Sequence, residues 1–311
     1  MKISSSLVNG LLANCTICPR RCGSDRTKGE PGYCRAGFKT RVYSHSPHHG
    51  EEPVLSGTRG SGTIFFSHCN MRCVYCQNYY FSQLDEGEEL SIEGLSETML
   101  RLAKMKCHNI NLVSPTHYAP QIALAARMAK ENGLDIPIVY NSGVYDLVDT
   151  LRLLDGIIDI YMPDMRYSSD EMAKKYSGAV QYVEYNRRAC VEMHRQVGDL
   201  VVDEHGIARK GLIIRLLVLP DDISGTKDTL RFIANEVSGK AFLSIMSQYY
   251  PTFKAYGYKE ISRGITSGEY LEIIGEAESL GLENGWIQER SIDLDLKFAG
   301  TSIKRQGGQI G

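Results

Sequence analysis

The chain has 311 residues, of which 42% are hydrophobic, and a formal net charge of −2. This length accommodates one barrel-type α/β domain with a small appendage, or two modest domains. The near-neutral charge excludes a strong electrostatic drive toward nucleic acid or an anionic membrane. No stretch approaches the ~18 consecutive apolar residues of a membrane span, and polar residues interrupt the N-terminus too often for a lipoprotein signal ending at Cys15. We therefore expect a cytoplasmic protein with neither nucleic-acid nor membrane partners.

Strand and helix patterns alternate along the chain from about residue 62. The predicted strands are 63–66, 110–113, 136–140, 157–162, 212–219 and 241–246. The predicted helices are 91–105, 120–131, 144–154, 168–197, 226–236 and a covering helix at 267–281. Such alternation predicts parallel strands joined by right-handed crossovers. The fold class is therefore α/β: a partial (β/α)6 TIM-type barrel over 62–250, with a Cys-rich N-terminal extension over 1–61 and a C-terminal covering segment over 251–311.

Polar side chains gather at the ends of these strands, where parallel α/β barrels bind their ligands. The candidate binding residues are Ser114, Thr116, Asn141, Ser142, Asp164 and Arg166, with Arg215 inside the fifth strand. The candidate catalytic residues are His117, Gln248 and Tyr249. Because Arg215 interrupts an apolar strand, its charge requires a carboxylate partner from the protein or from a ligand. The alternatives are a surface ion pair for Asp164 with Arg166, a turn at 141–143 and a buried structural role for His117.

Seven of the nine cysteines fall in two clusters, which favours metal binding in a reducing compartment over disulfides. The first cluster, Cys69, Cys73 and Cys76, has the spacing C-x3-C-x2-C and directly follows a predicted strand. Three thiolates can hold three irons of a 4Fe–4S cluster and leave the fourth iron open to an outside ligand, whereas a closed ferredoxin-type site needs a fourth cysteine. A zinc knuckle completed by His68 is the alternative.

The second cluster has the spacing C-x2-C-x3-C-x11-C. It comprises Cys15, Cys18, Cys22 and Cys34. Four thiolates can close a metal site completely, and both structural zinc and a second 4Fe–4S cluster fit this pattern. Either metal would fold this loop-rich segment, which has little apolar core of its own. The two remaining cysteines, Cys107 and Cys190, stand alone in helical patterns and are expected to be small buried apolar residues.

The first cysteine cluster, with Tyr75 before its last cysteine, resembles the signature of the radical S-adenosylmethionine (radical SAM) superfamily. In particular, the chain is similar to proteins related to pyruvate formate-lyase activating enzymes, in the branch with an N-terminal four-cysteine segment. The resemblance covers nearly the whole chain. It rests on the segments 15–23, 51–53, 60–66, 69–78, 114–117, 161–164 and 246–251.

The resemblance implies an enzyme whose 4Fe–4S cluster binds SAM at the open iron. Reduction by a flavodoxin- or ferredoxin-like donor would cleave SAM to a 5′-deoxyadenosyl radical that abstracts hydrogen from a substrate. The substrate would be a glycine of a partner protein, as in glycyl-radical activation, or else a peptide or small molecule. An iron–sulfur electron carrier without SAM chemistry and a zinc-stabilised binding module are the alternative functions.

The resemblance also implies roles for individual residues. Tyr75 would pack near the adenine, and the stretch Ser114–Thr116 stands where the family has a glycine-rich run that meets the SAM amino group. Asp164 and Arg166 match an Asp-x-Lys element near the methionine carboxylate, and Arg215 matches a second basic residue there. The amide of Asn141 and the hydroxyl of Ser142 suit a ribose.

Overall fold

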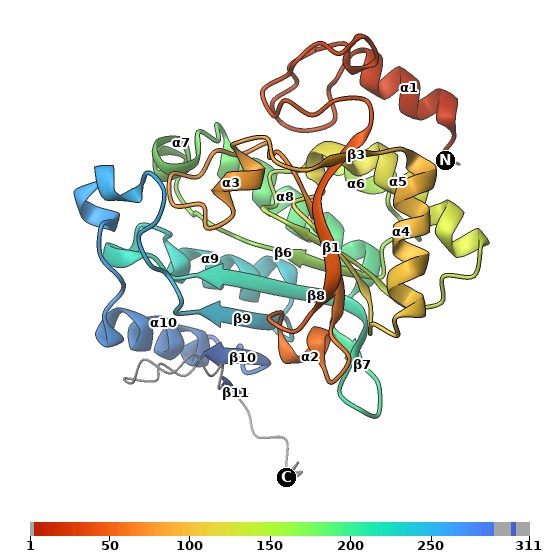
Figure 1. Ribbon diagram of the computed structural model, residues 1–311. Coiled ribbons are helices and arrows are strands. Elements are labelled where there is room, and N and C mark those ends of the chain that lie inside the picture. Colours follow the sequence, from red (N-terminus) through yellow and green to blue (C-terminus); the bar gives the residue numbers. More distant parts are fainter. Residues whose placement is uncertain (1–2, 289–299, 303–311) are drawn as a thin grey trace.

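The computed structural model describes residues 3–288 and 300–302 (Figure 1). All six predicted strands are present. They are Ser61–Phe66 (β2), Ile110–Val113 (β4), Ile138–Ser142 (β5), Ile160–Pro163 (β6), Ala208–Leu217 (β8) and Phe242–Met246 (β9). A further strand, Gly285–Gln288 (β10), pairs in parallel with β9 where the sequence predicted only the turn after the covering helix.

The parallel strands lie side by side in chain order, from β2 through β4, β5, β6, β8 and β9 to β10. Right-handed crossovers between strands in sequential order place their helices on one face of the sheet, and the other face is left as the lumen of a barrel. Among the described residues the sheet does not close on itself, because Glu88–Leu90 (β3) forms one end and Gly300–Ser302 (β11) the other. The architecture is therefore the partial barrel that the sequence predicted.

Most of the predicted helices are confirmed with shifted ends. The helices of the barrel are Ile92–Lys104 (α4), Ala119–Glu131 (α5), Val148–Arg152 (α6), Asp170–Ser177 (α7), Tyr182–Val197 (α8) and Thr226–Phe232 (α9). The α9 helix continues as a π-helical turn over Ile233–Val237, and the covering helix is Ser267–Ser279 (α10). The helix predicted over 144–154 is shorter because Val144 has a φ of +47°. The pattern over 168–197 is split because Gly178, with a φ of +60°, ends α7.

The first 61 residues contain more regular structure than the sequence predicted. They form Ser5–Ala13 (α1), Thr40–His48 (β1) and Pro53–Ser56 (α2). The β1 strand pairs antiparallel with β2 and carries β3 on its other edge, so part of this segment belongs to the sheet. The polar, Pro47-containing sequence of β1 is typical of an edge strand rather than of a buried one, which is why no apolar pattern marked it. The boundary at residue 61 stays a prediction.

Buried aliphatic side chains fill the space between the strands and the helices. The lone cysteines Cys107 and Cys190 are buried, as expected. The short strand Val201–Val202 (β7) pairs with β8, and β11 pairs with β10, both antiparallel. Within the described ranges, no helix has the length and apolar character needed to cross a bilayer.

Candidate active site

A cavity of about 450 Å³ opens at the carboxyl ends of the parallel strands. Its volume lies within the ~300–1,000 Å³ that is usual for small-molecule sites. The cavity wall includes the predicted residues Cys69, Cys73, Tyr75, Cys76, Ser114, Thr116, Asn141, Asp164, Arg166, Arg215 and Gln248. Residues separated by well over one hundred positions in sequence are thus brought to one chamber, because the ends of successive parallel strands meet at one edge of the sheet.

The cysteine loop runs from the end of β2 into Tyr79–Ser82 (α3) and is held by its backbone. The amides of Arg72 and Val74 donate to the last carbonyls of α7, at Ser177 and Tyr176, over 3.0 and 2.8 Å. These bonds give hydrogen-bond partners both to backbone amides of the loop and to the carbonyls at the end of the helix, which have no partner within the helix. The loop conformation is therefore fixed by a helix that begins about one hundred residues later in the chain.

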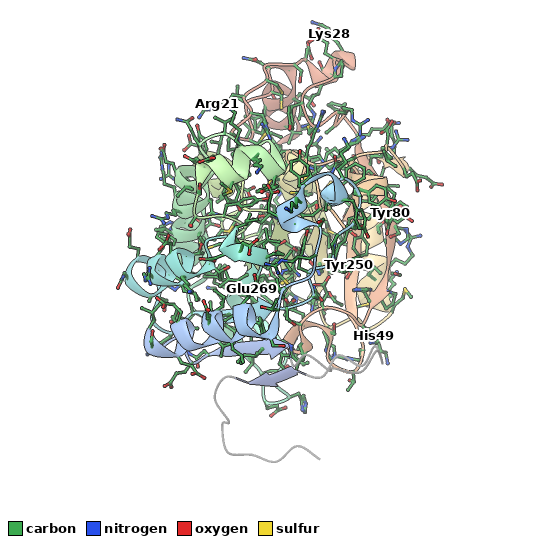
Figure 2. All side chains as sticks on the ribbon, turned by 90° about the vertical axis from the view of Figure 1, so that its left-hand side faces the viewer. Arg21, Lys28, His49, Tyr80, Tyr250 and Glu269 are labelled. Carbon is green, nitrogen blue, oxygen red and sulfur yellow. The ribbon has the colours of Figure 1, made fainter. Side chains whose placement is uncertain are left out.

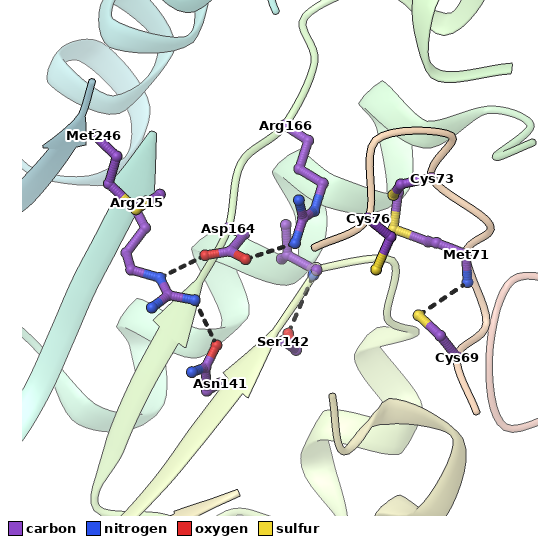
Figure 3. A network of polar contacts seen from close by, with 12 residues as sticks. Cys69, Met71, Cys73, Cys76, Asn141, Ser142, Asp164, Arg166, Arg215 and Met246 are labelled. Carbon is purple, nitrogen blue, oxygen red and sulfur yellow. Dashed lines mark hydrogen bonds and ion pairs between the residues drawn. The ribbon is translucent and has the colours of Figure 1, made fainter. Parts of the chain in front are cut away.

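Each of the three thiols has a hydrogen-bond partner close to its sulfur, and Ser82 donates to Cys76 when that thiol is ionised. The contacts are Met71 N to Cys69 Sγ at 3.3 Å, Ser177 Oγ to Cys73 Sγ at 3.0 Å and Ser82 Oγ to Cys76 Sγ at 3.3 Å. Figure 3 shows the first of these beside the three cysteines. Burial raises the pKa of Cys69 to about 12, and the neighbouring Cys73 adds to this effect. Buried, mutually repelling thiolates need positive charge between them, and the irons of a cluster supply it.

The donor set fits an iron–sulfur cluster better than zinc. Among the described residues, no three His, Cys, Asp or Glu side chains converge on a point that would hold a single metal ion. The thiolates of a cubane bind different irons, so they need no such common point. His68 does not complete a zinc site, because its Nε2 lies 2.5 Å from Asp85 Oδ1 and its Nδ1 lies 3.3 Å from the Tyr118 hydroxyl.

Asp164 is the centre of the polar network opposite the cysteines (Figure 3). Its Oδ1 accepts from Arg215 Nε at 2.6 Å, and its Oδ2 accepts from Arg166 Nη2 at 2.7 Å. Arg215 Nη2 also donates to Asn141 Oδ1 at 2.8 Å. The predicted pairing of Asp164 with Arg166 is thus present in the cavity wall rather than on the outer surface, and the carboxylate partner of Arg215 comes from the protein.

Arg166 lines the cavity and retains hydrogen-bonding capacity. Its Nε is buried and has no partner among the described residues. Beside it, Gly143 keeps the wall open, since a Cβ there would lie 3.0 Å from Met71 Sδ and 3.6 Å from Arg166 Nε. A buried donor without a partner carries a free-energy cost, which an anionic ligand group would remove.

The model of the radical SAM superfamily matches residues 63–233, which contain the cysteine loop and much of the cavity wall. The chain belongs to the radical SAM superfamily. Membership of this superfamily implies SAM-dependent radical chemistry and a 4Fe–4S cluster. The chain is also 30% identical over 293 residues to the uncharacterized protein MJ0674 of Methanocaldococcus jannaschii, and the match covers 91% of this chain and 80% of that protein.

Two solved structures are similar to this radical SAM protein at lower identity. Methylornithine synthase (PylB) is 18% identical with a TM-score of 0.49, over 73% of this chain and 63% of that one. SuiB of Streptococcus suis, bound to S-adenosylmethionine, is 12% identical with a TM-score of 0.47, over 71% of this chain and 48% of that one. The radical SAM chain described here thus spans less than two-thirds of either structure.

Three of the predicted site residues lie behind the cavity wall of this radical SAM protein. Ser142 Oγ donates to Asp146 Oδ2 at 3.0 Å, and the wall position is taken by Gly143. His117 is buried, with its Nε2 2.8 Å from Ser67 O, and burial lowers its pKa to about 3. The Tyr249 hydroxyl donates to Ile261 O at 2.6 Å. Neither candidate catalytic residue, His117 or Tyr249, lines the cavity, and their catalytic role stays a prediction.

Sequence reasoning missed Glu51 as a site residue. Its side chain lines the cavity, and its Oε2 lies 3.4 Å from Arg215 Nη1. Burial raises the pKa of this carboxyl group, while the Arg215 guanidinium opposes the rise. The segment 51–53 was part of the family resemblance, but no local pattern gave it a role.

The four N-terminal cysteines pack against the back of the cysteine loop. Cys15, Cys18 and Cys34 are buried, and Cys22 is exposed. Burial raises the pKa of Cys18 to about 12, and the nearby Cys34 and Cys15 add to this effect. Arg20 Nε donates to Asn70 O at 2.9 Å, next to Cys69 in the chain. The four-cysteine segment therefore contacts the cluster loop but does not line the chamber.

Proposed function

We propose that Cys69, Cys73 and Cys76 hold the 4Fe–4S cluster and that SAM binds across the chamber, where it is cleaved reductively to start a hydrogen abstraction. When bound and reduced, the cluster and SAM supply a 5′-deoxyadenosyl radical. The observation that carries the proposal is that three cysteines with donors at their sulfurs share one chamber with the guanidinium-bearing Arg166.

The polar wall supplies a role for each part of SAM. The Arg166 guanidinium binds the methionine carboxylate, while Asp164 holds that guanidinium in place. Ser114 and Thr116 face the amino group from the end of β4, and the Tyr75 ring packs near the adenine. Asn141 contacts the ribose, and Ser142 orients the turn behind it. The walls exclude water from the radical.

We further propose that the substrate is a polypeptide glycine, as in an activating enzyme. The chamber extends to the edge strand β1 through Tyr43, Ser44 and His48, on the side where the sheet is open. Figure 2 faces the carboxyl ends of the strands, where Tyr80 and the exposed Tyr250 lie on the same face. An open, aromatic-lined mouth is compatible with an extended chain.

The test begins with anaerobic reconstitution with iron and sulfide, followed by reductant and SAM. We expect 5′-deoxyadenosine from the wild type and from Cys190→Ala, whose cysteine is buried in α8, but none from Cys73→Ala. Wild-type protein that binds a cluster yet forms no 5′-deoxyadenosine would instead be an electron carrier. A radical detected by electron paramagnetic resonance on a partner polypeptide supports the glycine substrate, and turnover of small molecules alone contradicts it.

Two further features belong to the proposal. The four N-terminal cysteines bind a second metal, either a 4Fe–4S cluster or zinc, because burial and the neighbouring thiols raise the pKa of Cys18 and of Cys34, so that a cation is needed to stabilise their thiolates. Electrons come from a flavodoxin- or ferredoxin-like protein in the cytoplasm. Replacing dithionite with such a donor should sustain 5′-deoxyadenosine formation.

A further inference from the structure

A chain of buried hydroxyl groups leads from the chamber wall to the sulfur of Cys73. The Tyr75 and Tyr167 hydroxyls are 2.6 Å apart, and the Tyr167 hydroxyl lies 2.7 Å from Ser177 Oγ. Ser177 Oγ in turn donates to Cys73 Sγ at 3.0 Å. All three hydroxyl-bearing residues are almost fully buried, so water does not compete for these bonds.

Each hydroxyl group in this hydrogen-bonded series has one proton to donate, and this fixes which group donates to which. A thiolate accepts hydrogen bonds but donates none, so the single Ser177 proton points to Cys73 Sγ. Ser177 Oγ must then accept from Tyr167, and Tyr167 must accept from Tyr75. Each donation polarises the next hydroxyl and strengthens the last bond, the one to sulfur.

The backbone fixes Ser177 independently of this chain. Ser177 is the last residue of α7, and its carbonyl accepts from Arg72 N at 3.0 Å within the cysteine loop. Gly178 then turns the backbone out of the helix with a φ of +60°. The hydroxyl is therefore presented to Cys73 by a rigid helix end, as expected of an outer-shell partner of a metal ligand.

We propose that Ser177 is a positioning residue that, with Tyr167 and Tyr75 behind it, raises the reduction potential of the cluster held by Cys73. A hydrogen bond to a cluster sulfur stabilises the more negative, reduced state more than the oxidised one. Removing the donor makes the cluster harder to reduce. The inference rests on the proposed ligand role of Cys73 and extends it to residues that lie outside the cysteine motif.

The test is a redox titration of the reconstituted protein with dithionite, followed by electron paramagnetic resonance. It compares the wild type with variants that each remove one hydroxyl group of the hydrogen-bonded series. Ser177→Ala should shift the midpoint potential to more negative values. At a fixed potential, the ratio of reduced to oxidised cluster should fall roughly three- to tenfold, as expected when one ordinary hydrogen bond to the more negative state is lost. Tyr167→Phe should give a smaller shift of the same sign, and Tyr75→Phe the smallest.

Tyr176→Phe is the matched control, since it removes a hydroxyl from the same helix end, one that donates to Glu260 and not to the chain. Equal potentials in the wild type and Ser177→Ala, or an equal shift in Tyr176→Phe, would overturn the inference. If Ser177→Ala does not bind iron, the midpoint potentials of Tyr167→Phe and Tyr75→Phe test the inference instead. Potentials equal to that of the wild type in both variants would overturn it. A wild type that binds no 4Fe–4S cluster would reject the proposed function itself, whereas a SAM-cleaving wild type with unshifted variants rejects only this inference.

Discussion

The two cysteine clusters of this protein have the same side chains in opposite surroundings. Cys69, Cys73 and Cys76 line a chamber shared with charged strand-end residues. The four-cysteine segment is packed against protein on the far side of the same loop and shares no wall with the chamber. The difference indicates that access to a cavity, more than the cysteine count, separates a reactive site from a structural one.

The two regions are nonetheless in direct contact. The guanidinium of Arg20 lies 3.7 Å above the Tyr33 ring, and that of Arg72, from the cluster loop, lies 4.4 Å from the same ring. Arg20 also donates to the Gly178 carbonyl, just past the helix end that presents Ser177. Ordering of the four-cysteine segment should therefore stabilise the loop that carries the other three cysteines.

The largest expected effect is the difference in 5′-deoxyadenosine formation between a cysteine substitution in the first cluster and one in the second. Cys73→Ala should abolish 5′-deoxyadenosine formation, because the cluster loses one of only three ligands. Cys18→Ala should reduce metal content and open residues 10–40 to protease, while 5′-deoxyadenosine formation persists at a reduced level. The measurements are iron, sulfide and zinc analysis, limited proteolysis and product assay on the same samples.

If Cys18→Ala retains full iron at Cys69, Cys73 and Cys76 but forms no 5′-deoxyadenosine, the four-cysteine segment takes part in the reaction. The distinction between a reactive and a structural cluster would then be wrong. Chelation of the wild type offers a second check. Unchanged protease resistance over 10–40 after chelation would show that no metal orders the segment.

The next effect concerns the charged chamber wall. Asp164→Asn removes the carboxylate that two guanidinium groups share, and breaking a buried ion pair in this way costs about 3–5 kcal/mol. Arg166→Lys keeps the charge and should cost much less in stability while weakening SAM binding. Urea unfolding and SAM titration of both variants are the measurements. If Asp164→Asn is as stable as the wild type and binds SAM with the same affinity, the charged wall contributes no more to SAM binding than the four-cysteine segment does.

The parts of the fold that the sequence predicted are those with strong apolar periodicity. The strand at 110–113 and the helix starting after Ser91 are found with the predicted ends, because buried repeats and a side-chain cap mark them locally. The β1 and β10 strands were missed, since both lie near the ends of the sheet, carry no clear apolar pattern and owe their structure to the neighbours that pair with them.

The sequence placed Asp164 and Arg166 at the cavity correctly, because both follow directly on the end of a strand. A residue that acts through tertiary packing was not predictable. Ser177 is 104 residues from Cys73, and nothing in its local sequence distinguishes it from any serine at a helix end. The sequence could not place the His117 ring, because a strand-end histidine gives the same sequence pattern whether its ring enters the chamber or lies behind the wall.

A smaller effect, dependent on pH, should appear just behind the chamber wall. Asp146 accepts from the Tyr140 and Ser142 hydroxyls, and burial raises its pKa from 3.8 to about 6. The folded state thus binds this proton more tightly than the unfolded state. Its contribution to stability is full below about pH 3.8 and is lost as the pH rises through about 6, a change of roughly 3 kcal/mol at ~1.4 kcal/mol per pKa unit.

Asp146→Asn does not titrate, so the wild type should lose stability relative to this variant between about pH 4 and about pH 7.5. Urea unfolding of both proteins, prepared without iron so that acid-labile metal does not contribute, measures the difference. A difference that stays constant with pH would show that Asp146 is ionised freely and that the layer behind the chamber is as well solvated as the surface.

The smallest expected effect compares backbone strain in the two regions. Ser114, at the chamber, has a φ of +58°, and Arg21, in the four-cysteine segment, has a φ of +41°. Glycine adopts such angles without the ~1 kcal/mol penalty of other residues, although it gives back part of this gain through the entropy of the unfolded chain. Ser114→Gly and Arg21→Gly should therefore both leave the free energy of unfolding within about 1 kcal/mol of the wild type.

The two glycine variants should differ in ligand binding. Ser114→Gly and Ser114→Ala both lose the hydroxyl proposed to meet the SAM amino group, so both should weaken SAM binding to the same extent, and only the alanine variant should retain the backbone strain. Arg21→Gly should leave SAM affinity unchanged. If Arg21→Gly weakens SAM binding as much as Ser114→Gly does, the segment behind the loop shapes the chamber directly, and the division between an open reactive site and a closed structural one no longer holds.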